Sequence, residues 1–395
     1  MRVLLAGVST RAAAASAARA GFEVTAIDAF ADFDQHPSVD ARSLGDRFSP
    51  DAAARYAQAI ACDAVAYGSS FENDPDAVAL LAAGRVLLGN PSDVLRRVRD
   101  PKLLSDTLGR RGFAAPAVVD ESRFPPHESR ESRIPNPEPR ESRIPNPESR
   151  RAWLVKRRAS GGGHGVRPWR DAVRVPPGCY LQEFIDGAPE SIVFVAARGR
   201  VVPLGLFRQL IGDAAFGSSG YRYCGNILTA AGEDDEVVDA ACALARAVSE
   251  EFGLVGVNGI DLIVHNASPY AIEVNPRWCA SMELVERAYG VSVFGVHAAA
   301  CRDGVLPDFD LARARRRATT TGKAIVFSRR DVTVAGASSW LRDWLVKDDL
   351  HDVPHPGAQI RAGHPVCTVF AGGRDASECY AELVRRADRI YAAML

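Results

Sequence analysis

The sequence predicts a mixed α/β and α+β chain with two or three domains. Its 395 residues exceed what a single hydrophobic core of ordinary size contains. Over residues 1–90, short apolar runs alternate with helical patterns, as in "RVLLAG", "RAAAASAARAG" and "FEVTAID". Strand, helix and strand in that order predict a parallel sheet with helices on both faces, so the first domain is expected to be Rossmann-like.

The balance of charges points to small-molecule partners. The chain has 48 Lys and Arg residues against 49 Asp and Glu residues, and the basic residues are spread along it. This distribution gives no electrostatic basis for binding nucleic acid or an anionic membrane surface. No run of about 18 apolar residues occurs, which argues against a membrane span.

The cysteines and the first residues predict a cytoplasmic protein. The eight cysteines form no CxxC pair, and a chain of this size does not need disulfides, so we expect reduced thiols. The opening "MRVLLAGVST" has one basic residue and a short apolar run that ends at a glycine, unlike a signal peptide.

The first turn, "AGVSTRAAAA", raises the alternative of dinucleotide binding. It contains Gly7, and Asp28 closes the second predicted strand about 20 residues later, as in dinucleotide-binding folds. The GxGxxG pattern is absent, however, because Gly7 is the one glycine in this turn. The sequence therefore favours a Rossmann-like lobe without that cofactor.

A ten-residue repeat occupies residues 121–150, "ESRFPPHESR ESRIPNPEPR ESRIPNPESR". It contains seven of the chain's 24 prolines and three large apolar residues, too few to offset the entropy of ordering it. We therefore predict a disordered insertion. A proline-rich ligand for a partner domain is the functional alternative.

Helical patterns separate the remaining strands. Two short helices are expected over 91–113, with Lys102 at the start of the second, and an amphipathic helix over 234–252 begins with the acidic turn "EDDE". Residues 281–302 are also expected to be helical. Residues 323–395 read as a small α+β lobe that ends in a helix.

The stretch "LVKRRASGGGHGV" combines a strand, a lysine and a glycine-rich loop. Lys156 is on the predicted strand, and the loop consists of Ser160, Gly161, Gly162, Gly163 and Gly165 with their neighbours. Backbone N–H groups of such a loop can converge on an anion, while the lysine adds a positive charge. The lysine precedes the glycines, which excludes a P-loop. A flexible loop without a ligand is the alternative.

The stretch "GIDLIVHNASPYAIEVNPR" predicts a hairpin with paired acids. If its turn is centred on Ala267, Asp261 lies opposite Glu273, and Asn275 shares their face. Two carboxylates about 5 Å apart repel by roughly 3 kcal/mol at an effective dielectric of 20. A Mg²⁺ ion would offset this and bring phosphates with it, which Arg277 could also reach. In the alternative, a one-residue slip turns one acid towards solvent.

The stretch "YLQEFIDGAPESIVFV" interrupts an apolar strand with polar residues. Such a strand can offer backbone groups to the edge of an adenine ring and a carboxylate to ribose hydroxyls. The candidate residues are Gln182, Glu183, Phe184, Ile185 and Glu190. A surface hairpin with solvated acids is the alternative.

The loop "FGSSGYRYCGN", residues 216–226, is a candidate for substrate binding. Arg222 and Tyr223 give this glycine-rich segment the side chains needed to hold a substrate carboxylate. A plain surface turn is the alternative.

The order of these stretches resembles the ATP-grasp superfamily of ATP-dependent carboxylate ligases and carboxylases. In that family a Rossmann-like domain precedes a first lysine, a second lysine with a glycine-rich flap, a hinge strand, and an acid, acid, x, Asn, Pro, Arg ending. Lys102, Lys156, "SGGGHG", "QEFIDG", Asp261 and "EVNPR" follow in that order here. The 12-residue gap from Asp261 to Glu273 is the most specific part of the match.

The two ends of the chain extend the resemblance. The tail from "HDVPHPGAQIRAGHP" onward is similar to the small C-terminal lobe of biotin carboxylases and purine carboxylases, and the whole looks close to a branch of predicted ATP-dependent carboligases. This implies a pre-ATP-grasp domain at 1–90, an ATP-grasp domain at 91–310 with the insertion at 121–150, and a C-terminal lobe at 311–395.

The resemblance also implies roles for the candidate residues. Lys102 and Lys156 would hold the α- and β-phosphates of ATP beneath the loop 160–165, and the strand 182–185 would receive adenine. Gln182 stands where many relatives have an acid, so either Glu183 or Glu190 would bind ribose. The metal ligands for Mg²⁺, or alternatively Mn²⁺, would be Asp261, Glu273 and Asn275. Arg277, with Lys156, would act on the transferring phosphoryl group.

The expected function is that of a Mg-ATP-dependent ligase. ATP would phosphorylate a carboxylate, and an amine would attack the acyl phosphate. An ATP-dependent carboxylase using bicarbonate is the first alternative, and a regulatory protein that binds nucleotide without turnover is the second. The expected partners are a small-molecule carboxylate and amine, with a homodimer as one option for assembly and no nucleic acid or membrane.

Overall fold

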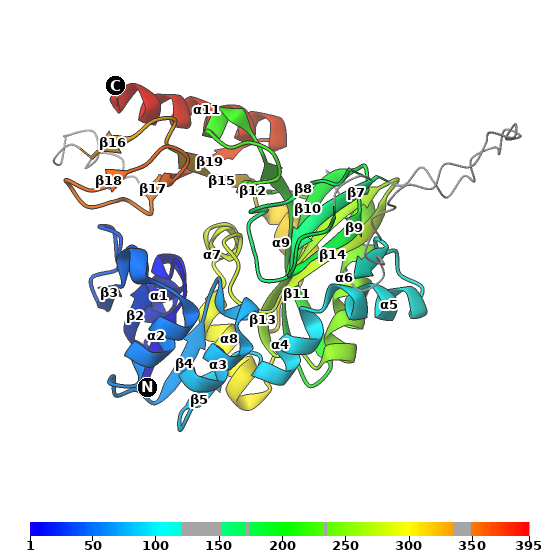
Figure 1. Cartoon of the computed structure of the whole chain (residues 1–395), viewed down its shortest axis with the longest axis horizontal. Coiled ribbons are helices and arrows are strands. Elements are labelled where there is room, and N and C mark those ends of the chain that lie inside the picture. The colour runs from blue at the N-terminus through cyan, green and yellow to red at the C-terminus, as the bar shows by residue number, and fades with distance from the viewer. Residues whose placement is uncertain (121–151, 171–173, 233–234, 335–348, 395) are drawn as a thin grey trace, which may run out of the picture.

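The computed structural model describes residues 1–120, 152–170, 174–232, 235–334 and 349–394 (Figure 1). A parallel α/β lobe at the N-terminus faces a large antiparallel sheet, and the C-terminal helix covers one part of that sheet (Figure 1). The repeat predicted at 121–150 lies outside the described residues. The predicted combination of α/β and α+β architecture is confirmed.

The N-terminal lobe contains the predicted parallel sheet, in the strand order β3-β2-β1-β4-β5. The strands are β1 (Arg2–Ala6), β2 (Glu23–Asp28), β3 (Val39–Ser43), β4 (Ala64–Tyr67) and β5 (Val86–Leu88). The helices are α1 (Arg11–Arg19), α2 (Pro50–Ala57) and α3 (Pro75–Leu81), with short 3₁₀ turns η1 (Gly45–Arg47) and η2 (Phe71–Asn73). This strand order is that of a Rossmann-like fold.

Asp28 does not offer its carboxylate to a ribose. It is 1% exposed and accepts hydrogen bonds from the N–H and hydroxyl groups of Thr10 and from the N–H groups of Phe30 and Ala31. Its acceptor capacity is thus used to fix the first turn and the loop after β2. This agrees with the structural interpretation of "AGVSTRAAAA".

Three helices in the first half of the chain begin with the same combination of a side-chain cap and a proline. An N-cap Ser49, Asp74 or Asp100 accepts a backbone N–H, and a proline follows directly at the first helical position of α2, α3 and α5. The capping side chain accepts a backbone N–H group that has no partner within the helix. Proline has no backbone N–H, so it leaves no such group without a partner at the first helical position. The pair α4 (Ser92–Val98) and α5 (Pro101–Arg110) confirms the two helices predicted over 91–113.

A small sheet carries the lysine strand and the hinge strand. Its order is β6-β9-β7-β8, all antiparallel neighbours. The strands are β6 (Val118–Asp120), β7 (Trp153–Arg157), β8 (Arg167–Pro168) and β9 (Cys179–Glu183). Lys156 on β7 pairs directly with Tyr180 on β9, so the two predicted nucleotide-binding strands are neighbours.

The large sheet has eight strands in the order β14-β13-β10-β11-β12-β15-β19-β17. The first five are β10 (Ala188–Ala197), β11 (Arg200–Ile211), β12 (Tyr223–Leu228), β13 (Gly256–His265) and β14 (Ser268–Asn275), and η5 (Ala214–Phe216) follows β11. Helix α6 (Asp235–Phe252) packs its apolar face on this sheet, against Ile192, Phe194 and Ile260. This confirms the amphipathic helix predicted at 234–252.

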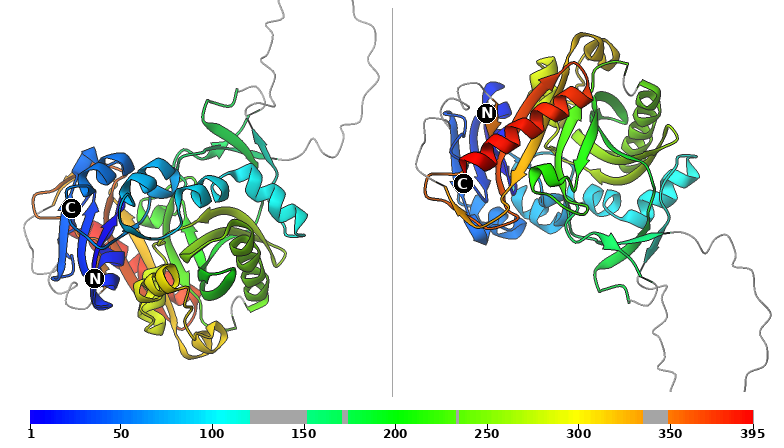
Figure 2. Two further views of the ribbon diagram at one scale, coloured as in Figure 1. Left: turned by 90° about the horizontal axis from the view of Figure 1, so that it is seen from below. Right: turned by 90° about the horizontal axis from the view of Figure 1, so that it is seen from above.

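The C-terminal lobe shares the large sheet instead of forming its own. Strands β15 (Thr320–Phe327), β17 (Leu350–His351) and β19 (Pro365–Gly373) extend it, and α11 (Ala376–Ala393) lies across them (Figure 2). Strands β16 (Val332–Thr333) and β18 (Gln359–Ile360) form a separate pair.

The region predicted to be helical over 281–302 consists of two helices, which are separated at residues 290–292. They are α7 (Met282–Tyr289) and α8 (Val293–Asp303), followed by α9 (Leu311–Arg317). Gly290 ends α7 with φ = +67°, a conformation that glycine adopts without strain. Among the described helices, none is long and apolar enough to cross a bilayer, and none of the eight cysteines forms a disulfide.

Candidate functional site

The hairpin of β13 and β14 brings the two predicted acids together. Asp261 pairs with Glu273, and their strands are joined by a two-residue turn at Asn266 and Ala267. Both turn residues have positive φ, +48° and +59°, as in a type I′ turn. The turn is centred between Asn266 and Ala267, half a residue before the predicted centre at Ala267. A bulge at Ile272 adds one residue to β14, so that Asp261 still pairs with Glu273 as predicted.

Asp261 is held by two amide side chains. Asn275 Nδ2 donates to its Oδ2 at 2.9 Å, and Gln209 Nε2 donates to its Oδ1 at 2.8 Å. Burial and the nearby charge of Glu273 raise the pKa of Asp261 to about 6, against the two amide hydrogen bonds. Two carboxyl groups thus share one buried site, which is common where a cation or a ligand is bound.

Lys156 reaches the same cluster from the small sheet. It is 9% exposed, and its Nζ donates to Gln182 Oε1 at 2.7 Å. Gln182 in turn donates to the carbonyl of the bulged Ile272 at 3.1 Å. Burial lowers the pKa of Lys156, while the charges of Glu273 and Asp261 oppose that shift. Gln182 therefore connects the lysine to the strand that carries the acids.

Arg99, at the end of α4, lies among these groups although the sequence did not single it out. Its Nη1 is bonded to Glu273 Oε1 and donates to the Val274 carbonyl at 2.9 Å. Its Nη2 donates to Asn73 Oδ1 at 2.7 Å and to the Ser160 carbonyl at 3.1 Å. One guanidinium thus joins the acid pair, the glycine loop and the N-terminal lobe.

Arg277 is also anchored across the two lobes. Its Nη2 donates to Glu72 Oε1 at 2.7 Å and to Asn275 Oδ1 at 3.2 Å. Glu72, on η2, is 1% exposed, and although burial opposes it, Arg277 lowers the pKa of this acid. Glu72 Oε2 and Arg277 Nε are buried without a hydrogen-bond partner in the described parts of the chain. Both therefore have capacity left for a ligand.

The glycine loop turns back over the cluster. Tyr223 N–H donates to the Gly162 carbonyl at 3.1 Å, which attaches the loop to the first residue of β12. At Gly163, φ is +74° and an added Cβ would lie 1.8 Å from the Tyr221 carbonyl oxygen, so this position requires glycine. The Ser160 hydroxyl donates to the Arg157 carbonyl at 3.1 Å.

The predicted adenine strand, β9, is an inner strand of the small sheet, and the more exposed candidate residues lie at its end and just after it. Phe184 is 41% exposed, Ile185 is half-buried, and Glu183 accepts the Ala117 N–H at 3.0 Å. Glu190, on β10, is buried at 4% exposure. The structure leaves the choice between the two glutamates for ribose as a prediction.

Lys102 and Arg222, two of the predicted site residues, make their contacts away from Asp261 and Glu273, whereas Tyr223 lies near Asp261. Lys102 Nζ pairs with Asp106 at 2.5 Å, one helical turn away on α5. The Arg222 guanidinium donates to the Gly363 carbonyl at 2.7 Å and lies 5.0 Å from the centre of the Phe327 ring. Tyr223, by contrast, donates its hydroxyl to Asn226 and has its pKa raised by burial, with a contribution from the charge of Asp261.

The residues missed by the sequence analysis are Glu72, Arg99 and Gln209. Glu72 belongs to the N-terminal lobe, and no local pattern places it beside Arg277. Arg99 directly precedes the Asp100–Pro101 cap of α5, so its position at a helix junction was the available signal. Gln209 is a polar residue at the end of an apolar strand, a common sign of a site.

The donor set fits one hard divalent cation completed by phosphate oxygens. Asp261, Glu273 and Asn275 offer carboxylate and amide oxygens, which Mg²⁺ and Mn²⁺ bind. Within the described residues, no group of three or more His, Cys, Asp or Glu side chains is arranged to hold a metal ion by itself. The pairing of Asp261 with Glu273, with Asn275 beside them, is the observation that supports a cation here.

An acid pair on an antiparallel sheet, beneath a glycine loop and facing a Rossmann-like lobe, is an arrangement that can hold a divalent cation together with the phosphates of a nucleotide. Residues 127–281 match the ATP-grasp domain family. The chain thus carries an ATP-grasp domain over these residues.

Solved structures share this fold over nearly the whole chain. The L-amino acid ligase of Bacillus licheniformis has a TM-score of 0.67 at 18% identity, covering 98% of this chain and 97% of that one. The biotin carboxylase domain of Hydrogenobacter thermophilus 2-oxoglutarate carboxylase has a TM-score of 0.67 at 13% identity, covering 98% and 88%. N5-carboxyaminoimidazole ribonucleotide synthetase from Thermotoga maritima has a TM-score of 0.64 at 15% identity, covering 98% of each.

A sequence relative covers a smaller part. An uncharacterised protein of Methanocaldococcus jannaschii is 27% identical over 124 residues, which is 31% of this chain and 28% of that protein. The identities to the solved structures are low, so those likenesses describe the fold and leave the substrate open.

Proposed function

We propose that the protein is a Mg-ATP-dependent carboxylate–amine ligase. The observation that supports this is the register of the hairpin, which places Asp261 opposite Glu273 with Asn275 bonded to Asp261. Lys156 and Arg277 add positive charge beside the pair. Phosphoryl transfer depends on such charge neutralisation and alignment more than on covalent help from the protein.

Each group has a role in this proposal. Asp261, Glu273 and Asn275 bind Mg²⁺, which would neutralise phosphate charge. Lys156 holds a phosphate oxygen of ATP, and the loop 160–165 covers it. Arg277, fixed by Glu72, steadies the phosphoryl group during transfer to the substrate carboxylate, and the amine then displaces phosphate from the acyl phosphate.

The test is ADP release by the purified protein with Mg²⁺ and pooled carboxylates and amines. Glu273→Gln should lower the rate by about 10²-fold or more, because the isosteric amide removes one metal ligand and one charge. Glu250→Gln is the matched control, since Glu250 pairs with Arg111 at the surface. Unchanged ADP release by the Glu273 variant would refute the metal assignment.

The carboxylase alternative remains because the chain resembles two carboxylating enzymes over 98% of its length, including the C-terminal strands β15 and β19. Bicarbonate therefore forms a separate pool in the same screen. ADP release that requires bicarbonate and no amine would favour the carboxylase.

A further inference from the structure

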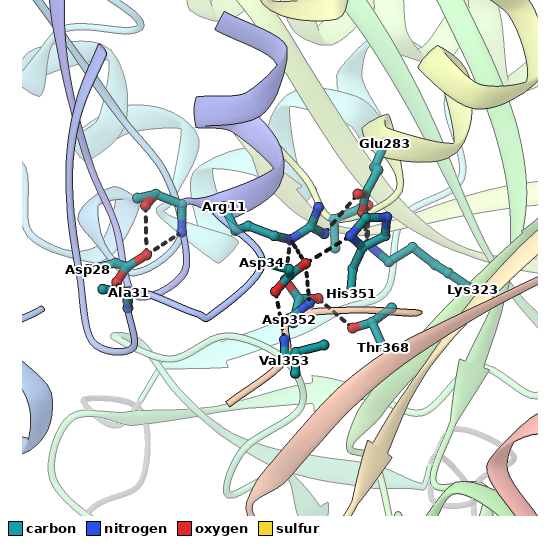
Figure 3. A network of polar contacts seen from close by, with 12 residues as sticks. Arg11, Asp28, Ala31, Asp34, Glu283, Lys323, His351, Asp352, Val353 and Thr368 are labelled. Carbon is teal, nitrogen blue, oxygen red and sulfur yellow. Dashed lines mark hydrogen bonds and ion pairs between the residues drawn. The ribbon is translucent and has the colours of Figure 1, made fainter. Parts of the chain in front are cut away.

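A buried network of charges joins the N-terminal lobe to α7 and the C-terminal strands (Figure 3). Arg11, the first residue of α1, is 3% exposed, and its guanidinium lies 2.8 Å from Asp352 and 2.8 Å from Glu283. Its charges balance, and the network serves to hold the lobes together. The acids are Asp34, Glu283 and Asp352, and the cations are Arg11, Lys323 and Arg287.

The basic residues of the small sheet are not balanced in this way. Residues 152–170 and 174–183 contain six Lys and Arg residues and one acid, Glu183, although the whole chain has a formal net charge of −1. Arg157 on β7 and Arg167 on β8 are exposed, and neither side chain makes an ion pair or a hydrogen bond within the described parts of the chain. All donors of these two guanidiniums are therefore available to a ligand.

The strand register places Arg157 and Arg167 on one face of the small sheet. Val155 pairs with Arg167, so their side chains share a face, and Arg157, two residues after Val155, shares it too. Lys156 points to the opposite face, where its Nζ donates to Gln182. The two free guanidiniums thus lie behind the strand that carries the lysine of the candidate nucleotide site.

A cavity of about 310 Å³ opens on this face and is lined by Arg157, Arg167, Cys179 and the turn 176–178. Its size is at the lower end of the range for small-molecule sites, roughly 300–1,000 Å³. The turn is stiff, because it contains two prolines and the Cys179 N–H donates to the Pro176 carbonyl at 3.1 Å. The cavity therefore has a fixed wall and two charges that favour an anion.

The same cavity adjoins both ends of the glycine loop. The Arg157 carbonyl accepts the Ser160 hydroxyl at 3.1 Å, where the loop begins. At the other end, Arg157 Nε lies 3.4 Å from the position that a Cβ on Gly165 would occupy. An anion bound to Arg157 would thus contact the base of the loop 160–165 from outside the candidate nucleotide site.

We propose that Arg157 and Arg167 form a second anion site, which binds the phosphate group of a small molecule. Each guanidinium is a planar fork that can donate to two oxygens, so a tetrahedral dianion can be held by both. A single carboxylate carries half that charge and has two oxygens in place of three. The cavity leaves room for the organic part of a phosphate monoester. This site is independent of the proposed ligase function.

Calorimetry with inorganic phosphate as the probe tests this site. Phosphate is titrated into the full chain at constant ionic strength, with Mg²⁺ and β,γ-methylene-ATP present to occupy the candidate nucleotide site. We expect phosphate to bind with a Kd of about 1 mM or lower, and acetate to bind at least about tenfold more weakly. Arg157→Gln and Arg167→Gln should each weaken phosphate binding by a similar factor.

Arg170→Gln is the matched control, because Arg170 is exposed on the same segment but does not line the cavity. It should bind phosphate as the wild type does. Because the three side chains are exposed, all variants should keep the wild-type Tm. The proposal is wrong if phosphate does not bind, if acetate binds equally, or if either cavity variant keeps full affinity. No ADP is formed in this assay, so its outcome is separate from that of the Glu273 test.

Discussion

Asp261 lies opposite Glu273 because β14 contains one more residue than the turn alone would align. Between the turn and Leu262 the two strands pair residue by residue, and without the bulge this register would place Ile272 opposite Asp261. Because Ile272 is the bulged residue, Glu273 is opposite Asp261 instead. The displaced carbonyl of Ile272 accepts the hydrogen bond from Gln182. The irregularity thus creates the acid pair and ties it to the lysine strand.

The turn that sets this register carries strain at Ala267. This exposed residue has φ = +59°, which costs an L-residue about 1 kcal/mol and glycine almost nothing. Ala267→Gly should therefore raise the free energy of unfolding by about 0.5–1 kcal/mol in urea titrations. Ala83→Gly, at an exposed turn residue without positive φ, should be neutral or destabilising. A loss of stability in the Ala267 variant would contradict the type I′ turn.

Arg99 and Lys102 lie on either side of the Asp100–Pro101 cap of α5, and their substitution should affect ADP release differently. Arg99 contacts Glu273 and the Ser160 carbonyl, whereas Lys102 pairs with Asp106. Arg99→Gln should lower kcat/KM for ATP at least about tenfold, because it removes a charge beside the acid pair. Lys102→Gln, measured in the same ADP-release assay, should stay within about threefold of wild type. A larger loss at Lys102 would restore the role that the family resemblance gives it.

Local patterns were enough to predict the parallel lobe, the acid pair and its hairpin, whereas β12 begins within the loop predicted at 216–226. Alternation of apolar residues and short turns depends on neighbours in sequence, so these features are visible without tertiary structure. The register was predicted correctly although the turn centre was not, because the bulge at Ile272 compensated for half a residue.

Contacts between distant elements could not be predicted in this way. Glu72 meets Arg277 across 205 positions, and no periodicity encodes that. Arg222 was predicted from composition alone, while its position depends on the packing of the C-terminal lobe around Gly363. The sequence therefore predicts the part of the site whose residues share one hairpin. It does not predict the contacts that form where two lobes meet.

His297 should make folding sensitive to acid. This residue of α8 is buried, with Nδ1 accepting the Val257 N–H at 2.9 Å and Nε2 placed 3.1 Å from the Leu88 carbonyl. Burial lowers the pKa of His297 from 6.5 to about 4. Between these values the unfolded chain binds a proton that the folded chain does not, so stability falls as pH falls through this window, by about 3 kcal/mol.

Urea unfolding at several pH values between 7.5 and 4 tests this sign. His297→Gln should be less stable at neutral pH but should lose less stability on acidification than the wild type. The same substitution at the exposed His265 should keep the wild-type profile. An equally steep profile in the His297 variant would show that other groups cause the acid sensitivity.

The repeat lies between β6 and β7 in the sequence, which allows a deletion to be designed. Strands β6 and β7 pair with opposite edges of β9, and Asp120 is level with Tyr180 while Trp153 is level with Glu183. Crossing two strand spacings and three residues along the strand requires about 14 Å. A ten-residue Gly/Ser linker has a typical span of about 17 Å, so it can replace residues 121–150 without moving either strand.

This replacement should leave ADP release within about threefold and change stability by about 1 kcal/mol, because closure entropy depends only weakly on loop length. Joining Asp120 directly to Arg151 is the informative comparison. Its three peptide links to Trp153 reach at most about 11 Å, so that variant must pull β7 out of register and displace Lys156. Activity lost in both variants would mean that the repeat itself contributes to catalysis, whereas loss in the direct join alone would show that only the span between the strands matters.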